Sequence, residues 1–173
     1  WKADAEARKP YIPSEQVTSD RRFYTEYKNN TVAGNDLYAI RKGHIDVPTL
    51  IRIDSIGKET RISSFASDAG RMWWDEDSKR LYWSETSTDE RWSLQTKSKI
   101  RYIEEGSGRK HTVRNSGLLY NPAPSHSQIA ATRYEQSGES FLDLIGSHTG
   151  KTIRSFQAPD SLQILEPVWN GDD

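Results

Sequence analysis

The sequence predicts an all-β fold of antiparallel four-stranded blades of a β-propeller, about three of them, as a fragment of a larger propeller. Three observations support this prediction. Short runs of β-forming residues follow one another, with Gly, Asn, Asp, Ser and Pro between them. No apolar stripe of helical period is long enough for an ordinary helix. Segments of the chain also resemble one another at a roughly regular spacing, which is the signature of a repeat architecture.

The composition suits several small aromatic cores better than one large aliphatic core. The chain has 173 residues, of which 34% are hydrophobic, and it contains six Trp and eight Tyr. A formal net charge of −1 does not favour a nucleic-acid partner. There are no cysteines, so disulfides and thiolate metal sites are excluded. No apolar run approaches the roughly 20 residues of a membrane-spanning helix, so no membrane span is expected.

The first repeated pattern is a strand, a polar turn with glycine followed by Lys or Arg, and a second strand. Its turn glycines are Gly57, Gly108 and Gly150, which lie 51 and 42 residues apart. Alternation of apolar and polar residues on both sides of each turn indicates half-buried strands. The three segments are LIRIDSIGKETRISSF (50–65), IRYIEEGSGRKHTVRNSG (100–117) and FLDLIGSHTGKTIRSF (141–156).

A second pattern lies between these segments. DEDSKRLYW (75–83) aligns with APSHSQIAA (123–131), so that Asp77 and Ser125 are 48 residues apart, and a further 48 residues lead to Asp173. About four short strands then fall in each period, as in a propeller blade. We therefore expect an N-terminal arm or linker over residues 1–18 and blades over 19–173. The repeats are 19–70, 71–117 and 118–166, with the start of the next at 167–173.

The repeat resembles the short motif S-P-D-G-K-x-I-A-F of TolB-like (WD-like) β-propeller proteins. Ala123–Ala131 keeps the Pro and the Ile-Ala pair of that motif, and Asp75–Trp83 keeps the Asp, a basic residue and the apolar pair. Leu142–Lys151 resembles the family segment that ends in Thr-Gly-Lys. Neither copy has the Asp-Gly pair of the family turn. The resemblance implies a propeller with more blades than this chain supplies and a periplasmic, cell-surface or otherwise exported bacterial setting.

The motifs that would indicate catalysis or a cofactor are incomplete. GSHTGKT (146–152) has three residues between its glycines where a phosphate loop has four, and no helix is expected after it, so we predict a hairpin turn. No pair of histidines has the spacing of a helical zinc site. No G-x-S-x-G segment marks a nucleophile. We therefore assign no catalytic, cofactor-binding or metal residues, and expect no cofactor.

Four residues are the candidates for partner binding. Asp75, Glu76 and Asp77 form an acidic turn between two aromatic clusters, with a calcium loop as the alternative to a solvated turn. Ser78 stands where a calcium loop would have its glycine, which favours the solvated turn. Trp92 lies in the inserted segment 84–92 and is the candidate for an exposed aromatic residue, whereas Trp73, Trp83 and Trp169 are expected to pack between blades.

These observations favour a non-enzymatic scaffold or binding module for a protein or peptide partner. The first alternative is an accessory propeller domain of an exported peptidase or hydrolase whose catalytic domain lies outside this chain. The second is a carbohydrate-binding module that uses exposed aromatic residues. Because an arc of about three blades exposes two blade faces, we expect the rest of a propeller or a second chain to cover them.

Overall fold

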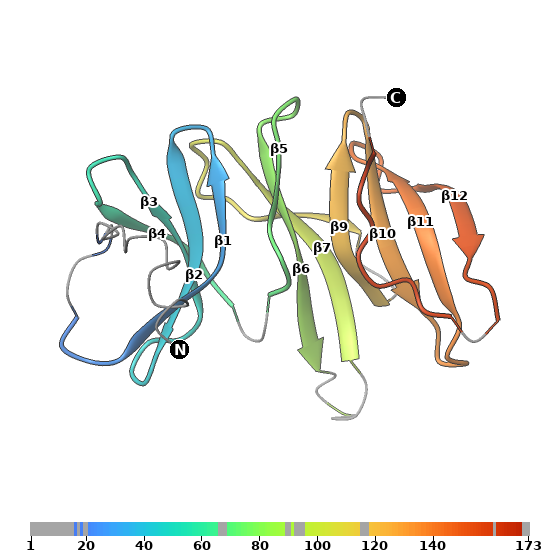
Figure 1. The fold of residues 1–173 in the computed structure, drawn as a ribbon, viewed down its shortest axis with the longest axis horizontal. Helices are drawn as coiled ribbons and strands as arrows, with labels where there is room; N and C mark the ends of the chain where they lie inside the picture. The colour runs from blue at the N-terminus through green and yellow to red at the C-terminus, as the bar shows by residue number, and fades with distance from the viewer. Residues whose placement is uncertain are drawn as a thin grey trace, which may run out of the picture.

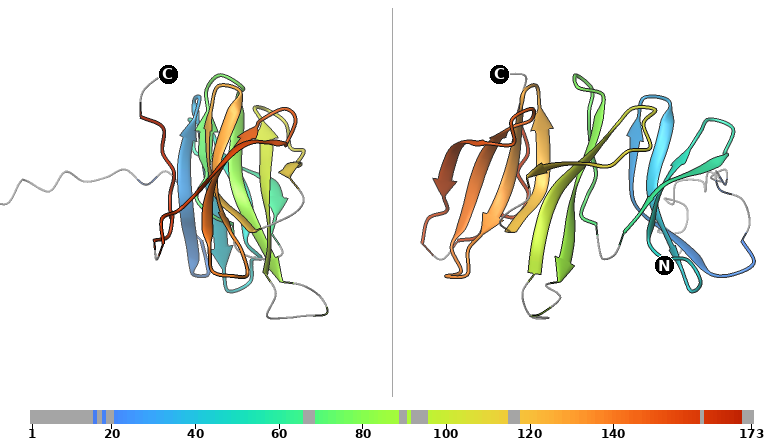
Figure 2. Two further views of the ribbon diagram at one scale, coloured as in Figure 1. Left: turned by 90° about the vertical axis from the view of Figure 1, so that its right-hand side faces the viewer. Right: turned by 180° about the vertical axis from the view of Figure 1, so that it is seen from behind.

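The part of the chain that the structure describes is all-β and forms three four-stranded antiparallel sheets that follow one another in a row (Figure 1), and the view from behind shows the same order (Figure 2). The computed structural model describes residues 16, 18, 21–65, 69–88, 91, 96–114, 118–160 and 162–170. The expected N-terminal arm, residues 1–18, lies almost wholly outside the described residues. Each sheet is a meander of four consecutive strands, as the repeats predict, so the predicted fold class is confirmed.

We refer to the sheets as blades 1, 2 and 3. Blade 1 comprises β1 (Thr25–Ala33), β2 (Asp36–Gly43), β3 (Thr49–Ile53) and β4 (Glu59–Ser64). Blade 2 comprises β5 (Trp73–Asp75), β6 (Arg80–Thr88), β7 (Thr96–Glu104) and β8 (His111–Arg114). Blade 3 comprises β9 (Leu118–Ser125), β10 (Gln128–Tyr134), β11 (Ser140–Gly146) and β12 (Thr152–Gln157).

The first strands of neighbouring blades contact one another, β1 with β5 and β5 with β9, so these strands form the inner side of the arc. Two of the inner strands are irregular. Asn29 in β1 and Asn121 in β9 have φ angles of 50° and 49°, and the pairing register shifts beside each of them. Asparagine tolerates this left-handed conformation better than most residues. The bulges turn both side chains toward the segment that follows their own blade, since Asn29 donates to the carbonyls of Ala69 and Gly70 and Asn121 donates to the carbonyl of Leu165.

The core lies in layers between blades, as the repeats predict, but its buried residues are mostly aliphatic rather than aromatic as the composition suggested. We call the face of a blade toward the preceding blade its leading face, and the opposite face its trailing face. Between blades 1 and 2, the fully buried Trp83 meets Phe65 edge-on, with ring centroids 6.0 Å apart. The full set in this layer is Ala33, Tyr38, Ile40, Leu50, Phe65, Met72, Leu81, Trp83 and Ile103.

The layer between blades 2 and 3 is smaller, with Tyr82, Ile100, Leu119, Ile129, Ala131 and Ile145. Neighbouring residues of one strand point to opposite faces of a sheet. Tyr82 and Trp83 therefore serve the two different layers of blade 2. A third cluster, Ala39, Ile51 and Ile53, lies on the leading face of blade 1.

The tryptophans that were expected to pack between blades differ in burial. Trp83 is fully buried, and Trp74 packs at the margin of the layer between blades 1 and 2. Trp73 is half-buried, with the Arg71 guanidinium 4.3 Å above its ring. Trp169 is 37% exposed and donates its indole N–H to the Ala123 carbonyl. Of the two neighbours in β5, Trp74 is therefore the one that contributes to the layer.

The turn glycines agree with the repeat pattern in two blades of three. Gly57 and Gly150 adopt positive φ angles of 79° and 65°. In blade 2 the glycine with a positive φ is Gly106, at 69°, rather than Gly108. The sequence pattern placed the emphasis on Gly108 because that glycine precedes a basic residue. The segment 146–152 forms the turn between β11 and β12, in agreement with the predicted hairpin.

Candidate functional site

The residues that share a position in the three blades can be identified from strand register. Within each blade one residue of the second strand lies opposite one of the third: Leu37 opposite Ile53, Leu81 opposite Ile103, and Ile129 opposite Ile145. Four residues further along the second strand come Arg41, Glu85 and Arg133. Because side chains alternate along a strand, these three residues lie on the leading faces of their blades.

Each of these charged residues is paired within its own blade. Glu85 lies 3.0 Å from the Lys110 ammonium and 3.3 Å from Arg101 Nε. Arg133 lies 2.9 Å from Asp143, a carboxylate that is almost fully buried. The sign of the charge alternates from blade to blade, with Arg41 in blade 1, Glu85 in blade 2 and Arg133 in blade 3. The common feature is therefore an ion pair at the margin of the leading face, rather than a particular residue type.

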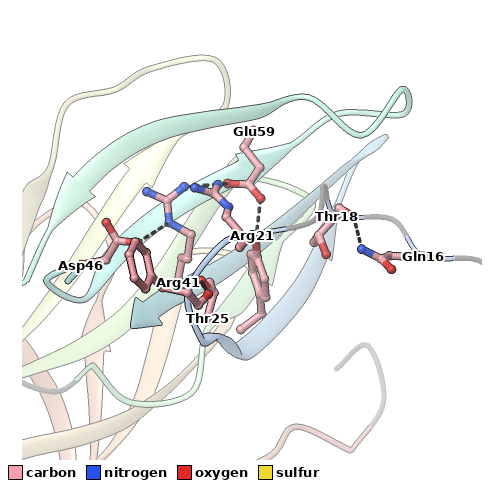
Figure 3. Close-up of polar contacts among 9 residues, drawn as sticks. Gln16, Thr18, Arg21, Thr25, Arg41, Asp46 and Glu59 are labelled. Carbon is pink, nitrogen blue, oxygen red and sulfur yellow. Dashed lines mark hydrogen bonds and ion pairs between the residues drawn. The ribbon is translucent and has the colours of Figure 1, made fainter. Parts of the chain in front are cut away.

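Blade 1 has the most extended of these clusters, which Figure 3 shows in close-up. The Glu59 carboxylate accepts hydrogen bonds from Tyr27 Oη at 2.6 Å, from Arg41 at 2.6 Å and from Arg21. Arg41 Nε also lies 3.8 Å from Asp46. Arg21 precedes β1, whereas the other residues belong to blade 1 or its loops, so the cluster connects the incoming chain to the sheet. We call Arg21, Tyr27, Arg41, Asp46 and Glu59 the blade 1 ion cluster.

The environment of Glu59 stabilises its charged form. Burial acts to raise the pKa of Glu59, but the hydrogen bonds from Tyr27 and Arg41 and the charges of Arg21 and Arg41 outweigh it, so the pKa lies below its usual value. Burial and the hydrogen bond to Glu59 raise the pKa of Tyr27. A general base needs a pKa near the working pH. Glu59 is thus a charged structural acceptor with both carboxylate oxygens engaged, and it is poorly suited to proton transfer.

We expect the stability of the protein to depend on pH through Glu59. Since the folded-state pKa is lower than the unfolded one, the stabilisation is fully present above the unfolded pKa of about 4.3. It is lost as the pH falls through the folded-state pKa. The difference in free energy of unfolding between wild type and Glu59→Gln, from urea titrations at several pH values, is expected to shrink from pH 7 to pH 3.

The exposed Asp160, replaced by Asn, provides the control for that titration. The difference in free energy of unfolding between Asp160→Asn and wild type is expected to stay small at every pH, because exposed carboxylates contribute little to stability. A Glu59→Gln difference of the same size at pH 7 and pH 3 would show that the carboxylate charge does not stabilise the fold.

An open surface pocket of about 320 Å³ lies beside the blade 1 ion cluster. Its lining is largely polar and includes Thr18, Arg21, Arg22, Tyr24 and Tyr27. Arg21 and Tyr27 are already held by Glu59, so two of the lining groups are fixed in place. Such a lining can position a small polar group, but no pair of its side chains has the arrangement of a nucleophile and its base.

The three residues of the acidic turn differ in burial and in the groups that they contact. Asp75 is buried at the end of β5 and accepts the Ser78 hydroxyl, as expected for a side chain that shapes a turn. Glu76 is exposed and accepts the indole N–H of Trp74 at 2.6 Å. Asp77 is exposed and lies 3.8 Å from His126 of blade 3. Partner binding by these residues stays a prediction, and Trp92 lies outside the described residues.

Metal and membrane features were also considered. Among the residues that the structure describes, no group of three or more His, Asp or Glu is placed to hold a metal ion. In the same part of the chain, no helix is long and apolar enough to cross a membrane.

Sequence reasoning did not identify the ion pairs of the leading faces. The residues at the shared position are Arg, Glu and Arg, so an alignment by residue type does not reveal them. The pairing register of the strands was needed to recognise that these three residues share a position. A pattern search that allows either sign of charge four residues after the apolar residues Leu37, Leu81 and Ile129 would have found all three.

Comparison with solved structures finds three similar proteins, one of which is described as a β-propeller domain. The chain matches the AtxE2 isopeptidase with Astexin3 bound at 15% identity and a TM-score of 0.58, over 71% of this chain and 19% of that one. The acylaminoacyl peptidase of Pyrococcus horikoshii matches at 10% identity and a TM-score of 0.59, over 80% and 26%. The β-propeller domain of the trilobed protease from Pyrococcus furiosus, described as having an open velcro topology, matches at 8% identity and 0.57, over 81% and 44%.

These similarities show the fold, a set of β-propeller blades. The chain spans less than half the length of each of the three structures. No protein-family model matches the chain, and no curated protein is similar to it in sequence at a significant level. The resemblance to TolB-like proteins therefore stays a prediction from the repeat motif.

Proposed function

We propose that this chain is part of the accessory β-propeller of a peptidase whose catalytic groups lie outside these residues. The observation that supports the proposal is that the three similar structures are an isopeptidase, an acylaminoacyl peptidase and a protease. The described residues add a second argument, because their charged side chains are engaged in ion pairs that fasten each blade rather than in a nucleophile–base pair.

In this role the blades would act on a protein or peptide without cleaving it. The inter-blade core and the ion-paired residues Arg41, Glu85 and Arg133 at the margins of the leading faces provide a rigid support. A rigid support is the structural requirement for positioning a substrate or partner. The non-enzymatic binding scaffold favoured by the sequence is the second candidate. A binding scaffold would use the same rigid support to position its partner, and it would differ from the first candidate only in having no catalytic domain. We also propose the exported bacterial setting that the style of the repeats implies.

The deciding experiment compares the full-length product of the gene with the 173-residue chain. We expect the full-length protein to hydrolyse fluorogenic oligopeptides and to react with a fluorophosphonate serine-hydrolase probe, while the 173-residue chain does neither. If the full-length protein lacks both activities and instead retains a peptide or protein in crosslinking, the scaffold candidate replaces the peptidase proposal.

A further inference from the structure

An open pocket of about 290 Å³ lies at the end of blade 3, between the β10–β11 turn and the chain that follows β12 (Figure 1). Residues 137–140 line one side, and residues 157–160, 162 and 163 line the other. The Ala158 N–H donates to the Ser140 carbonyl at 2.9 Å, and the Ser140 hydroxyl donates to the Leu162 carbonyl at 3.3 Å. These bonds hold the two sides together, and we call the hollow between them the blade 3 pocket.

The lining of the blade 3 pocket carries two carboxylates and no cation. Glu139 lies on the turn and Asp160 lies on the chain after β12. The Glu139 carboxylate accepts hydrogen bonds from the Ser137 hydroxyl and the Gln157 amide, both at 2.8 Å, and neither donor is charged. Asp160 is exposed, and its side chain makes no hydrogen bond or ion pair with another residue that the structure describes. The negative charge of the pocket is therefore uncompensated within the described part of the chain.

Carboxylates at the margins of the leading faces are, by contrast, paired with cations of their own blades. Glu85 is paired with Lys110, and Asp143 is paired with Arg133. The Arg133 guanidinium also contacts Glu135 at the start of the β10–β11 turn, so this cation is already engaged, and it does not line the pocket. The blade 3 pocket thus holds acceptors for a cation that the described residues do not supply.

The same pocket has an apolar side. Ala158, Pro159 and Leu162 belong to its lining, and Leu162 is 62% exposed. Lys and Arg side chains combine an apolar stem with a charged head, and they bury the stem along apolar surface. A volume of about 290 Å³ is at the lower limit of ligand pockets and suits one long side chain better than a large molecule. Charge and shape therefore both favour a single basic side chain.

We propose that the blade 3 pocket binds one arginine or lysine side chain of a peptide. The apolar stem would lie against Pro159 and Leu162, and the charged head would lie between Glu139 and Asp160. Because neutral hydrogen bonds already hold the Glu139 carboxylate, it loses little conformational freedom on binding. The choice of a peptide as the carrier of the basic group rests on the proposed function, whereas the complementarity to a cation does not.

The test measures the binding of two peptides to the full-length product of the gene. One is dye-labelled Ala-Ala-Arg-Ala-Ala, and the other has citrulline, an uncharged analogue of nearly the same shape, in place of the arginine. The protein is first treated with a fluorophosphonate, so that a serine hydrolase does not cleave the peptides. Fluorescence anisotropy then gives the dissociation constant of each peptide, and the ratio of the two constants reports the preference for the cation.

We expect the arginine peptide to bind about tenfold more tightly than the citrulline peptide, because two partly exposed ion pairs contribute about threefold each. Glu139→Gln and Asp160→Asn are each expected to lower this preference about threefold, and the double variant is expected to abolish it. Both residues are exposed, so the substitutions leave the fold intact, which urea unfolding verifies. Glu105→Gln removes an exposed carboxylate of the β7–β8 turn and is the control that keeps the full preference.

Three results would overturn the proposal. They are equal affinity for the two peptides, a preference that survives in the double variant, and a preference that is the same at about 50 mM and about 500 mM NaCl, since salt screens exposed ion pairs. The measurement does not depend on hydrolysis. A full-length protein that prefers arginine through Glu139 but cleaves no peptide would support the pocket and refute the peptidase proposal, and a peptidase without this preference would do the reverse.

Discussion

Replacing Trp83 by alanine is expected to lower the free energy of unfolding by about 3–5 kcal/mol. Trp83 is fully buried between blades 1 and 2 and contacts Phe65, so the deletion leaves a cavity that two sheets line together. Sheets are stiff and close only partly around such a cavity, which places the loss toward the upper part of the range. Thermal and urea unfolding followed by circular dichroism measure the effect, with a fall in Tm of roughly 10 °C.

Two variants separate the packing contribution from other causes. Trp83→Phe keeps most of the buried ring, and among the described residues the indole N–H has no hydrogen-bond partner to lose. Its expected cost is about 1 kcal/mol. Trp73→Ala removes a half-buried ring under Arg71 and is expected to cost about 1–2 kcal/mol. Equal losses for Trp83→Ala and Trp73→Ala would contradict the assignment of Trp83 to the inter-blade core.

Gly150→Ala is expected to destabilise the protein by about 3 kcal/mol or more, through two separate effects. Gly150 has a φ of 65°, a conformation that costs an alanine about 1 kcal/mol or somewhat more. An added Cβ would also overlap the carbonyl oxygen of Val113, which belongs to blade 2. The backbone of one blade would then have to move away from the other, and overpacking of this kind typically costs 1–3 kcal/mol.

Gly138→Ala is the matched control for that variant. Gly138 has a φ of 91°, but no atom lies within 4 Å of the place where its Cβ would be. The control therefore carries the backbone cost alone, and urea unfolding of the two variants isolates the contact between blades. If Gly138→Ala is as destabilised as Gly150→Ala, the close approach of Gly150 to Val113 contributes nothing to stability.

The sequence was sufficient for the fold because its signals are local. A hairpin is specified by apolar alternation and by turn residues such as those around Gly57 and Gly150, and both are visible without knowledge of the tertiary structure. The repeat then fixed the number of strands per blade. The point at which each inner strand begins was less visible. In blade 1, β1 begins at Thr25, and Arg21 in the chain before it is bound to Glu59.

Less of the candidate site could be predicted, since its contacts join residues that are distant in sequence. Arg41 and Glu59 lie on different strands and meet diagonally across β3, so neither residue signals the other in the sequence. The bulges at Asn29 and Asn121 were also missed, because a single asparagine inside a strand pattern has no distinctive neighbours. The acidic turn 75–77 was conspicuous in the sequence, yet Asp75 is a buried hydrogen-bond acceptor of the turn itself.

The meander topology has a consequence for how the protein unfolds. Within each blade, every strand pairs with its neighbour in the chain, and the packing between sheets joins blades that are consecutive. Stability in such an array is approximately the sum of the stability of each unit and of its contacts with its nearest neighbours. Blade 2 alone has both neighbours within the described residues. Unfolding is then easiest from the outer units and hardest at the centre, so backbone amides of β6 and β7 should exchange with solvent last.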